Sequence, residues 1–280
     1  MLKLKEVKEC YYPTSLDEAV DILKRHGEKA KLVGGGLHIA VFPNPQIETL
    51  IFLNKLNLSY VKENVNWISI GAMTTITELA ESEAMKQFLG GNVSKALFNI
   101  ASELLRNQIT IGGSVVQREP YSDITTILCA LKAKIVIFDG SERELTVDDF
   151  FNKDLRSTLK NTIVKEVKLN KFDTSYKFGM ERYTRNATDI SLLNMAILSK
   201  IEDGIIKDAS VAYGSRPMPT ERFTQFEEFL KGKSLEDAIN GAYEFAKEHA
   251  DIKGDARTSE EYRREIAGVF AKRILESFRR

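Results

Sequence analysis

Two glycine-rich runs, Val33-Gly34-Gly35-Gly36-Leu37 and Thr110-Ile111-Gly112-Gly113-Ser114, lie far apart in this chain of 280 residues, and each follows a helix-like stretch. Adjacent glycines cost backbone entropy, so each run requires either a positive φ or a ligand pressed against the main chain. Bare backbone N–H groups suit an anionic group such as a diphosphate. Two such places therefore predict one ligand that is long enough to touch both.

Neither common phosphate-binding motif fits the first run. The dinucleotide motif G-x-G-x-x-G fails because Ile39 stands where its third glycine is needed, and a P-loop fails because no lysine follows in register. In the second run, Thr110 and Ser114 place hydroxyl donors beside the glycines. Farther along, Asp123 either accepts a hydrogen bond from a sugar hydroxyl of the ligand or N-caps a helix that begins at Ile124. The residues alone favour the cap.

Residues 1–60 have the pattern of a small α/β unit. A helix is expected over 16–26, because Thr14 or Ser15 can cap its N-terminus and Gly27 can end it. Alternation of apolar residues and turn signals then predicts further elements. Before residue 170 these are strands at 31–33, 47–53, 67–71, 134–138 and 163–167, and helices at 75–85 and 92–105.

A domain boundary is expected near residues 170–175. The elements expected beyond it are strands near 177–178, 196–201 and 209–213, with a hairpin turn at Asp203-Gly204, and helices at 222–231, 235–249 and 259–278. The sequence thus predicts an α+β protein. Its first domain is 1–173, with subdomains of about 1–57 and 58–173, and its second domain, 174–280, combines a three-stranded antiparallel sheet with a helical bundle.

Composition excludes several classes of protein. Forty basic and forty acidic residues leave no net charge, so a nucleic-acid footprint is not indicated. Cys10 and Cys129 are the two cysteines, too few for a disulfide framework, an iron–sulfur cluster or a zinc site, so no metal ligands are expected in this chain. The N-terminus lacks the apolar core of a signal peptide, and no stretch approaches the roughly 18 apolar residues of a membrane span. A cytoplasmic location is expected.

Four segments, in order along nearly the whole chain, resemble a known family. They are residues 32–37, Leu104-Leu105-Arg106-Asn107-Gln108-Ile109-Thr110-Ile111-Gly112-Gly113-Ser114 with Pro120-Tyr121-Ser122-Asp123, Arg185-Asn186-Ala187-Thr188-Asp189, and Ser259-Glu260-Glu261-Tyr262-Arg263-Arg264. They are similar to the FAD-binding segments and the C-terminal R-x-x-x-D and S-x-x-Y-R-R elements of the flavoprotein, or medium, subunits of molybdenum hydroxylases of the carbon monoxide dehydrogenase and xanthine dehydrogenase type.

The resemblance implies an FAD-binding domain of two subdomains followed by a C-terminal domain of the flavoprotein subunit. It also implies the cofactor-binding residues: Leu32, Val33, Gly34, Gly35, Gly36, Leu37 and His38 on one side of the FAD diphosphate, Thr110, Gly112, Gly113 and Ser114 on its other side, Ser122 and Asp123 at a hydroxyl of the FAD, and Lys177, Asp189 and Ile190 near the isoalloxazine ring. Ser114 stands where the family usually has Asn, and Ile190 stands where many relatives have an aromatic residue.

The implied function is that of an electron-transfer subunit. A molybdenum-containing large subunit and a small subunit with [2Fe–2S] clusters would be the partners, in a dimer of heterotrimers, and NAD or a quinone would accept the electrons. No catalytic acid or base is expected in this chain, because the protein binds, orients and tunes the flavin. Two alternatives stay open. One is a self-sufficient FAD-dependent oxidoreductase on the same scaffold, and the other is a non-catalytic nucleotide-binding module.

Overall fold

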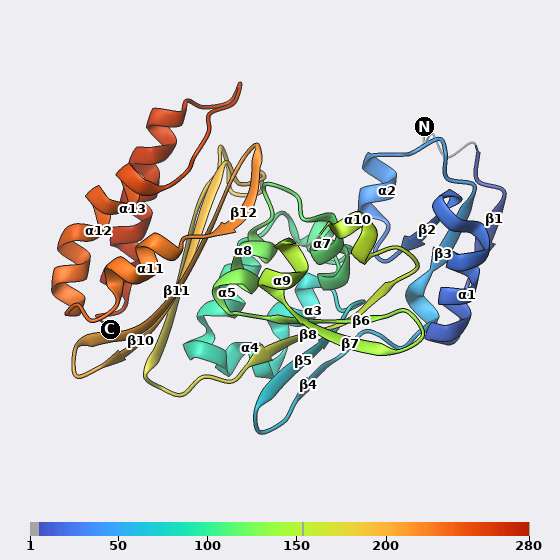
Figure 1. The fold of residues 1–280 in the computed structure, drawn as a ribbon, viewed down its shortest axis with the longest axis horizontal. Coiled ribbons are helices and arrows are strands. Elements are labelled where there is room, and N and C mark those ends of the chain that lie inside the picture. The colour runs from blue at the N-terminus through green and yellow to red at the C-terminus, as the bar shows by residue number, and fades with distance from the viewer. Residues whose placement is uncertain (1–5, 153, 280) are drawn as a thin grey trace. The chain divides into compact units, whose positions relative to one another are not determined.

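The computed structural model describes residues 6–152 and 154–279, which form two compact units (Figure 1). The first unit extends to Leu79 and also includes Glu103–Val116 and Lys134–Leu169. The second unit contains Ala80–Ser102, Gln117–Ala133 and the chain from Asn170 onward. Each unit is therefore assembled from separated segments. Residues 1–5, on which the expectation of no signal peptide rests, lie outside the described residues.

A parallel three-stranded sheet of order β1-β3-β2 opens the first unit. Its elements are β1 (Glu9–Tyr11), α1 (Leu16–His26), η1 (Gly27–Lys29), β2 (Ala30–Val33), α2 (Leu37–Val41), β3 (Thr49–Phe52) and η2 (Leu53–Lys55). The predicted helix over 16–26 is confirmed: Ser15 Oγ accepts the N–H of Glu18 at 3.2 Å, and Gly27 ends the helix with φ of 56°. Its apolar side packs in a core with Ile51 and Leu53.

A second sheet, of order β4-β5-β8-β6-β7, completes the first unit. The remaining elements there are β4 (Val61–Glu63), β5 (Trp67–Gly71), α3 (Ile76–Glu81), α6 (Glu103–Arg106), α7 (Ile111–Gln117), β6 (Lys134–Phe138), β7 (Glu142–Thr146), α9 (Val147–Asn152), α10 (Leu155–Thr158) and β8 (Ile163–Asn170). The strands expected at 67–71, 134–138 and 163–167 are thus present. Strands β4 and β7 were missed because their charged residues leave no apolar alternation.

Two helices expected as continuous are each interrupted. The stretch 75–85 divides at Ser82, whose side chain accepts the N–H of Met85 and so starts a new helix, α4 (Glu83–Gln87). The stretch 92–105 divides into α5 (Asn92–Phe98) and α6, since Ala101 between them has φ of 48°, which no helix residue adopts. The spacing of apolar residues does not predict either of these helix breaks.

The second unit contains an antiparallel sheet of order β12-β11-β10-β9. Its further elements are η3 (Phe88–Gly91), α8 (Asp123–Ala130), β9 (Tyr176–Tyr183), β10 (Leu193–Glu202), β11 (Ile205–Ser215), β12 (Met218–Arg222), α11 (Thr224–Leu230), α12 (Leu235–His249) and α13 (Glu260–Ser277). The prediction of three strands is wrong, because the described chain has four. The sequence pattern did not predict β12 because Pro217 and Pro219 argue against a strand. Proline is tolerated there because β12 is an edge strand.

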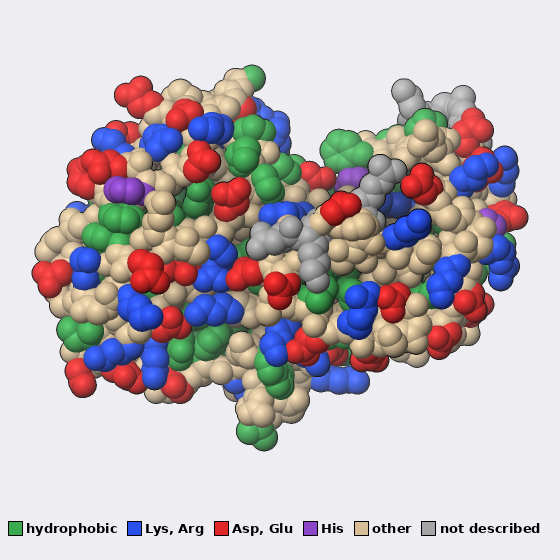
Figure 2. Space-filling view, viewed as in Figure 1, with side chains coloured by type: hydrophobic (Ala, Val, Ile, Leu, Met, Phe, Trp, Pro, Cys, Tyr) green, Lys and Arg blue, Asp and Glu red, His purple; other side chains and the backbone are tan. Residues whose placement is uncertain are grey.

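Strand β10 is buried on both faces of this sheet. Met195 and Ile197 belong to the core formed with helices α11–α13, whereas Asn194, the residue before Met195, accepts a hydrogen bond from Thr126 of α8. Figure 1 shows α11–α13 on one side of β10 and β11, and α8 on the other. Such two-sided burial explains the nearly continuous apolar run of β10. On the face shown in Figure 2, acidic and basic side chains are interspersed, as the balanced charge predicts.

Tyr213 of β11 provides a test of this core. Burial raises the pKa of Tyr213 to about 12, and its hydroxyl accepts the N–H of Asp251 at 3.0 Å. The folded state therefore favours the neutral phenol, a stabilisation that is complete below pH 10 and is lost as the pH rises toward 12. We expect the wild type to lose up to roughly 2.5 kcal/mol of unfolding free energy relative to Tyr213→Phe across this window. Parallel denaturant titrations at pH 9 and 12 measure the difference, and equal losses in both proteins would contradict it.

Candidate functional site

The first glycine run leaves the end of β2 and enters α2. Gly36, with φ of 78°, is the N-cap of that helix. Gly35 has a different constraint: a Cβ at this position would stand 1.6 Å from the carbonyl oxygen of Gln108. Only glycine permits so close an approach of two backbone segments. The first run is therefore packed directly against the chain that leads into the second run.

Thr110 is the second point where the runs meet. Its Oγ1 lies 2.9 Å from the place that a Cβ of Gly34 would occupy, and Thr110 itself forms a β-bridge with Thr75. Gly112, the second residue of α7, packs against Ala72, whose Cβ would lie 2.7 Å from a Cβ of this glycine. The prediction that the two runs act at one place thus has a geometric basis within the first unit.

The two runs differ in their free hydrogen-bond donors. Among the residues that the structure describes, the N–H groups of Gly35 and Gly36 donate to no acceptor of the protein. In the second run, Gly112 N–H donates to Ala72 O at 2.9 Å, Gly113 N–H to Thr110 Oγ1 at 3.2 Å, and Ser114 N–H to Thr110 O at 3.0 Å. The expectation of bare donors therefore fits the first run and not the second. Of the two hydroxyls in the second run, Ser114 Oγ donates to Thr110 O at 3.1 Å, and Thr110 Oγ1 accepts the N–H of Gly113.

The other predicted residues of the first segment flank the glycines. Leu32 and Val33 lie in β2, and Val33 is buried. Leu37 and His38 open α2, and the His38 ring lies 5.2 Å from the ring of Phe42, centroid to centroid. Both are half-buried, so each keeps a surface that a ligand can contact.

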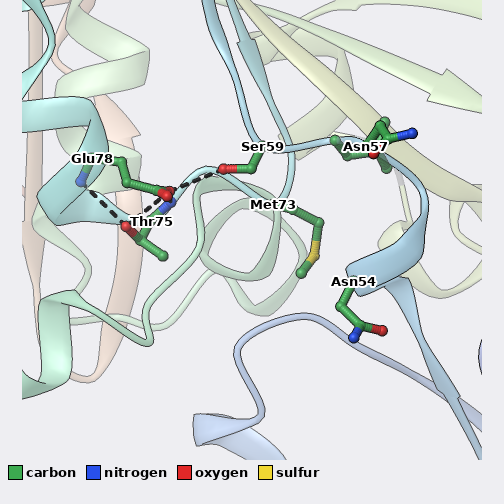
Figure 3. A pocket seen from close by; sticks show the side chains of 7 residues that line it. Asn54, Asn57, Ser59, Met73, Thr75 and Glu78 are labelled. Carbon is green, nitrogen blue, oxygen red and sulfur yellow. Dashed lines mark hydrogen bonds between the residues drawn. The ribbon is translucent and has the colours of Figure 1, made fainter.

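A hollow of about 370 Å³ opens beside the first run, and the sequence reasoning missed it (Figure 3). It is lined by Asn54, Asn57, Leu58, Ser59, Met73, Thr75 and Glu78. The sulfur of Met73 lies 3.6 Å from the Cβ position of Gly34, which places the hollow next to the glycines. Figure 3 shows Glu78 bonded to Thr75 and to Ser59, whose hydroxyl donates to it at 3.0 Å. A lining with a carboxylate and without Lys or Arg disfavours phosphate and suits a neutral ring or sugar.

Asp123 lies in the second unit and is buried, with 4% of its surface exposed. The cap of α8 is Ser122, whose Oγ accepts the N–H of Thr125, so the reading of Asp123 as the N-cap is wrong. Asp123 Oδ1 accepts hydrogen bonds from Ser191 Oγ at 2.6 Å and Asn194 Nδ2 at 2.7 Å, and its Oδ2 lies 3.1 Å from Arg182 Nε. Burial raises the pKa of the Asp123 carboxyl, and the Arg182 charge opposes that rise.

The remaining predicted residues are also in the second unit. Lys177 lies on β9, paired in register with Ser199 of β10. Asp189 and Ile190 lie in the loop between these strands. Asp189 Oδ2 is 2.7 Å from Arg185 Nε, which lowers the pKa of the Asp189 carboxyl, and its Oδ1 accepts the N–H of Ile190 at 2.9 Å. Ile190 is half-buried.

The described residues have neither a cluster of metal ligands nor a helix suited to crossing a membrane. No group of three or more His, Cys, Asp or Glu side chains among them is arranged to hold a metal ion. Cys10 is exposed and Cys129 is buried. Within 6–152 and 154–279, no helix has both the length and the apolar character needed to cross a membrane.

Two models of known protein families match this chain, one after the other. Residues 5–170 match the model described as the FAD binding domain in molybdopterin dehydrogenase. Residues 180–278 match the CO dehydrogenase flavoprotein C-terminal domain. Among curated proteins, the chain is 28% identical to the glyceraldehyde dehydrogenase medium chain of Sulfolobus acidocaldarius, over 94% of this chain and 95% of that protein. It is 26% identical to the carbon monoxide dehydrogenase medium chain of Hydrogenophaga pseudoflava, over 96% of each.

Solved structures agree with these sequence matches. The chain superposes on a chain of the carbon monoxide dehydrogenase from Hydrogenophaga pseudoflava with a TM-score of 0.88, at 27% identity and 96% coverage of both chains. A chain of quinoline 2-oxidoreductase from Pseudomonas putida 86 gives a TM-score of 0.87 at 20% identity, with 99% of this chain and 98% of that chain covered. The latter similarity concerns the fold alone.

Proposed function

Because the chain belongs to the family of FAD-binding domains in molybdopterin dehydrogenases, we propose that its two glycine runs hold the diphosphate of FAD. FAD is the cofactor of this family, and the chain is an FAD-dependent oxidoreductase subunit that transfers electrons within a molybdenum hydroxylase complex. The observation that carries the proposed site is the contact of Gly35 with Gln108, beside the free N–H groups of Gly35 and Gly36.

The backbone at these glycines suits a diphosphate. Two neighbouring N–H donors attract an anion, and the absence of side chains lets its oxygens approach the main chain. The Thr110 hydroxyl would add a polar contact from the other side, and Ser114 would do so by turning its hydroxyl from Thr110 O to the cofactor. The hollow lined by Asn54 and Met73 lies next to this point, so it is available to an uncharged part of the same cofactor.

The other implied contacts remain part of the proposal. Leu32, Val33, Leu37 and His38 would border the diphosphate from the first segment, with Gly112 and Gly113 opposite. Ser122 and Asp123 would meet a cofactor hydroxyl, and Lys177, Asp189 and Ile190 would approach the isoalloxazine ring. Among these, Asp123 uses both carboxylate oxygens inside the protein, so a hydroxyl would have to share Oδ2 with Arg182.

FAD, when bound, supplies the conversion of single-electron arrivals into two-electron delivery. The chain's own residues bind and orient it and exclude water from it, and we assign none of them as a general acid or base. The wider assembly is also a proposal: a molybdenum-containing large subunit and a [2Fe–2S] small subunit, arranged as a dimer of heterotrimers, with NAD or a quinone as acceptor. Domains over 1–173, subdivided near residue 57, and 174–280 are the proposed arrangement along the chain.

The test begins with an absorbance spectrum of the purified full chain, followed by release and identification of the cofactor. We expect flavin absorbance at ~450 nm and released FAD, not FMN. After the cofactor is removed, ADP should compete with FAD for rebinding far better than adenosine does, because the diphosphate contributes the contacts at the glycines. A chain that binds no added FAD, or that binds it equally well in the presence of excess ADP, would remove the proposed site.

The alternative of a self-sufficient oxidoreductase predicts a different result. Such an enzyme would turn over substrate with the FAD-loaded chain alone. The subunit reading instead predicts that the loaded chain is reduced by substrate only after the molybdenum and iron–sulfur subunits are added. Stopped-flow bleaching of the flavin band, with and without these subunits, separates the two.

A further inference from the structure

Arg182, near the end of β9, is the hub of a buried polar network that the sequence reasoning did not single out. Its Nε lies 3.1 Å from Asp123 Oδ2 and donates to Ser191 Oγ at 3.2 Å. The Arg182 side chain is mostly buried, with 14% of its surface exposed, and the Asp123 side chain is 3% exposed. A charged pair so far from water is retained only when its remaining donors and acceptors are used.

The other donors of Arg182 bind main-chain carbonyls, two of them in the loop between β9 and β10 and one at Asn99, which follows α5. Its Nη2 donates to Asp189 O at 2.7 Å, and its Nη1 donates to Ala187 O at 3.5 Å and to Asn99 O. The planar guanidinium therefore connects one buried carboxylate to three carbonyl groups in fixed directions.

This connection determines how the loop is held. Residues from Arg185 to Thr188 are exposed, and the loop's own bonds are local, such as Asp189 N–H to Asn186 O at 3.2 Å. The Arg182 contacts and the following Ser191, which donates to Asp123, tie its base to the buried interior. The same loop carries Asp189 and Ile190, which the proposed function places at the isoalloxazine ring.

We propose that Arg182 is a positioning residue of the flavin site, anchored by Asp123 and Ser191, which sets the backbone at Asp189 and thereby the placement of Asp189 and Ile190 against the ring. The proposal rests on the proposed function. It gives Asp123 a second, indirect role besides the proposed contact with a cofactor hydroxyl: the carboxylate orients Arg182, and this effect on the flavin passes through the loop.

The test compares two arginines of the second unit. Arg182→Lys keeps the charge but cannot make the forked contacts, whereas Arg222→Lys makes the equivalent change at a pair remote in sequence from the loop, where Arg222 Nε and Nη2 both donate to Glu227 Oε1. Ser191→Ala is a milder second variant in case Arg182→Lys does not fold. Each full-length protein is measured without and with FAD, by amide exchange at residues 186–190, by the flavin spectrum and by the flavin midpoint potential.

In the FAD-free chain, we expect Arg182→Lys to speed amide exchange of the loop by about tenfold or more, since hydrogen bonds to a charged group are lost. With FAD bound, the spectrum and potential should shift in Arg182→Lys and, to a smaller extent, in Ser191→Ala, and stay at wild-type values in Arg222→Lys. Unchanged loop exchange, or equal flavin shifts in the two Lys variants, would overturn the proposal.

Asp123→Asn distinguishes the indirect role from direct contact. The indirect role predicts faster loop exchange in Asp123→Asn even without FAD, together with the same direction of flavin shift as Arg182→Lys. Weaker FAD binding with wild-type loop exchange would leave Asp123 only its direct contact with the cofactor and overturn the proposal. If the wild-type chain bound no FAD at all, the proposed function would fail, while the exchange data without FAD would still report whether Arg182 holds the loop.

Discussion

Gly35→Ala is expected to destabilise the chain and to remove its ability to bind FAD. The new methyl group would stand 1.6 Å from the carbonyl oxygen of Gln108, an overlap that requires one of the two backbone segments to move. Backbone cannot yield as a flexible side chain does, so we expect a loss of about 3 kcal/mol in unfolding free energy. Because the displaced segments are the two proposed to hold the diphosphate, FAD affinity should fall by at least ~100-fold.

Gly36→Ala provides the matched control for this prediction. Gly36 has a positive φ, but its Cβ position is open, with Val33 Cγ1 at 3.9 Å as the nearest atom. Strain alone then costs about 1–2 kcal/mol, without displacement of the second run. Denaturant unfolding of the FAD-free proteins and titration with FAD measure the two effects separately. If Gly36→Ala were the more damaging change, backbone conformation and not the close approach would explain the first run.

The sequence predicted the local elements best where one residue determines the outcome. Ser15 and Gly27 bound the first helix because a cap and a stop act within one turn. The breaks at Ser82 and Ala101 were not foreseen, since serine and alanine are compatible with both helix and turn. Their conformations depend on tertiary packing, which local patterns do not contain.

The candidate site, like the secondary structure, was predictable from the sequence only in part. The two glycine runs, one of three and one of two adjacent glycines, stood out because adjacent glycines cost backbone entropy and so need a structural reason. Their proximity agrees with the inference that they act together. The donor pattern could not be predicted, because it depends on which carbonyls, such as Ala72 O, happen to face each N–H group. The role of Arg182 could not be predicted from the sequence either, because a single arginine in a strand is common. Its contact with Asp123 arises only from the fold.

The S-x-x-Y-R-R resemblance likewise gains a physical explanation. Ser259 caps α13 by accepting the N–H of Tyr262 at 3.2 Å. The two arginines that follow have opposite environments: Arg263 is fully buried, whereas the Arg264 side chain is 27% exposed and pairs with Glu260 one turn earlier. One motif therefore combines a helix cap, a buried anchor and a surface ion pair, and the two arginines invite a direct comparison.

Arg263→Met is expected to be the most destabilising change in the second unit. Arg263 Nη1 donates to Lys253 O at 2.9 Å and to Arg216 O, and its Nη2 donates to Asp255 Oδ1 at 2.5 Å. Methionine fills most of the volume but leaves the Asp255 carboxylate and two carbonyls without these donors, which costs about 3–5 kcal/mol.

Arg264→Met removes a neighbouring arginine from the same helix and serves as the control. Its ion pair with Glu260 is solvated, so we expect a loss below about 1 kcal/mol. Urea unfolding of both variants at neutral pH measures the difference. Comparable losses in the two would mean that Arg263 contributes through its hydrocarbon stem, which methionine also supplies, and not through the buried donors. A large loss in Arg263→Met alone would show that these donors hold the segments around Arg216 and Asp255 to the last helix.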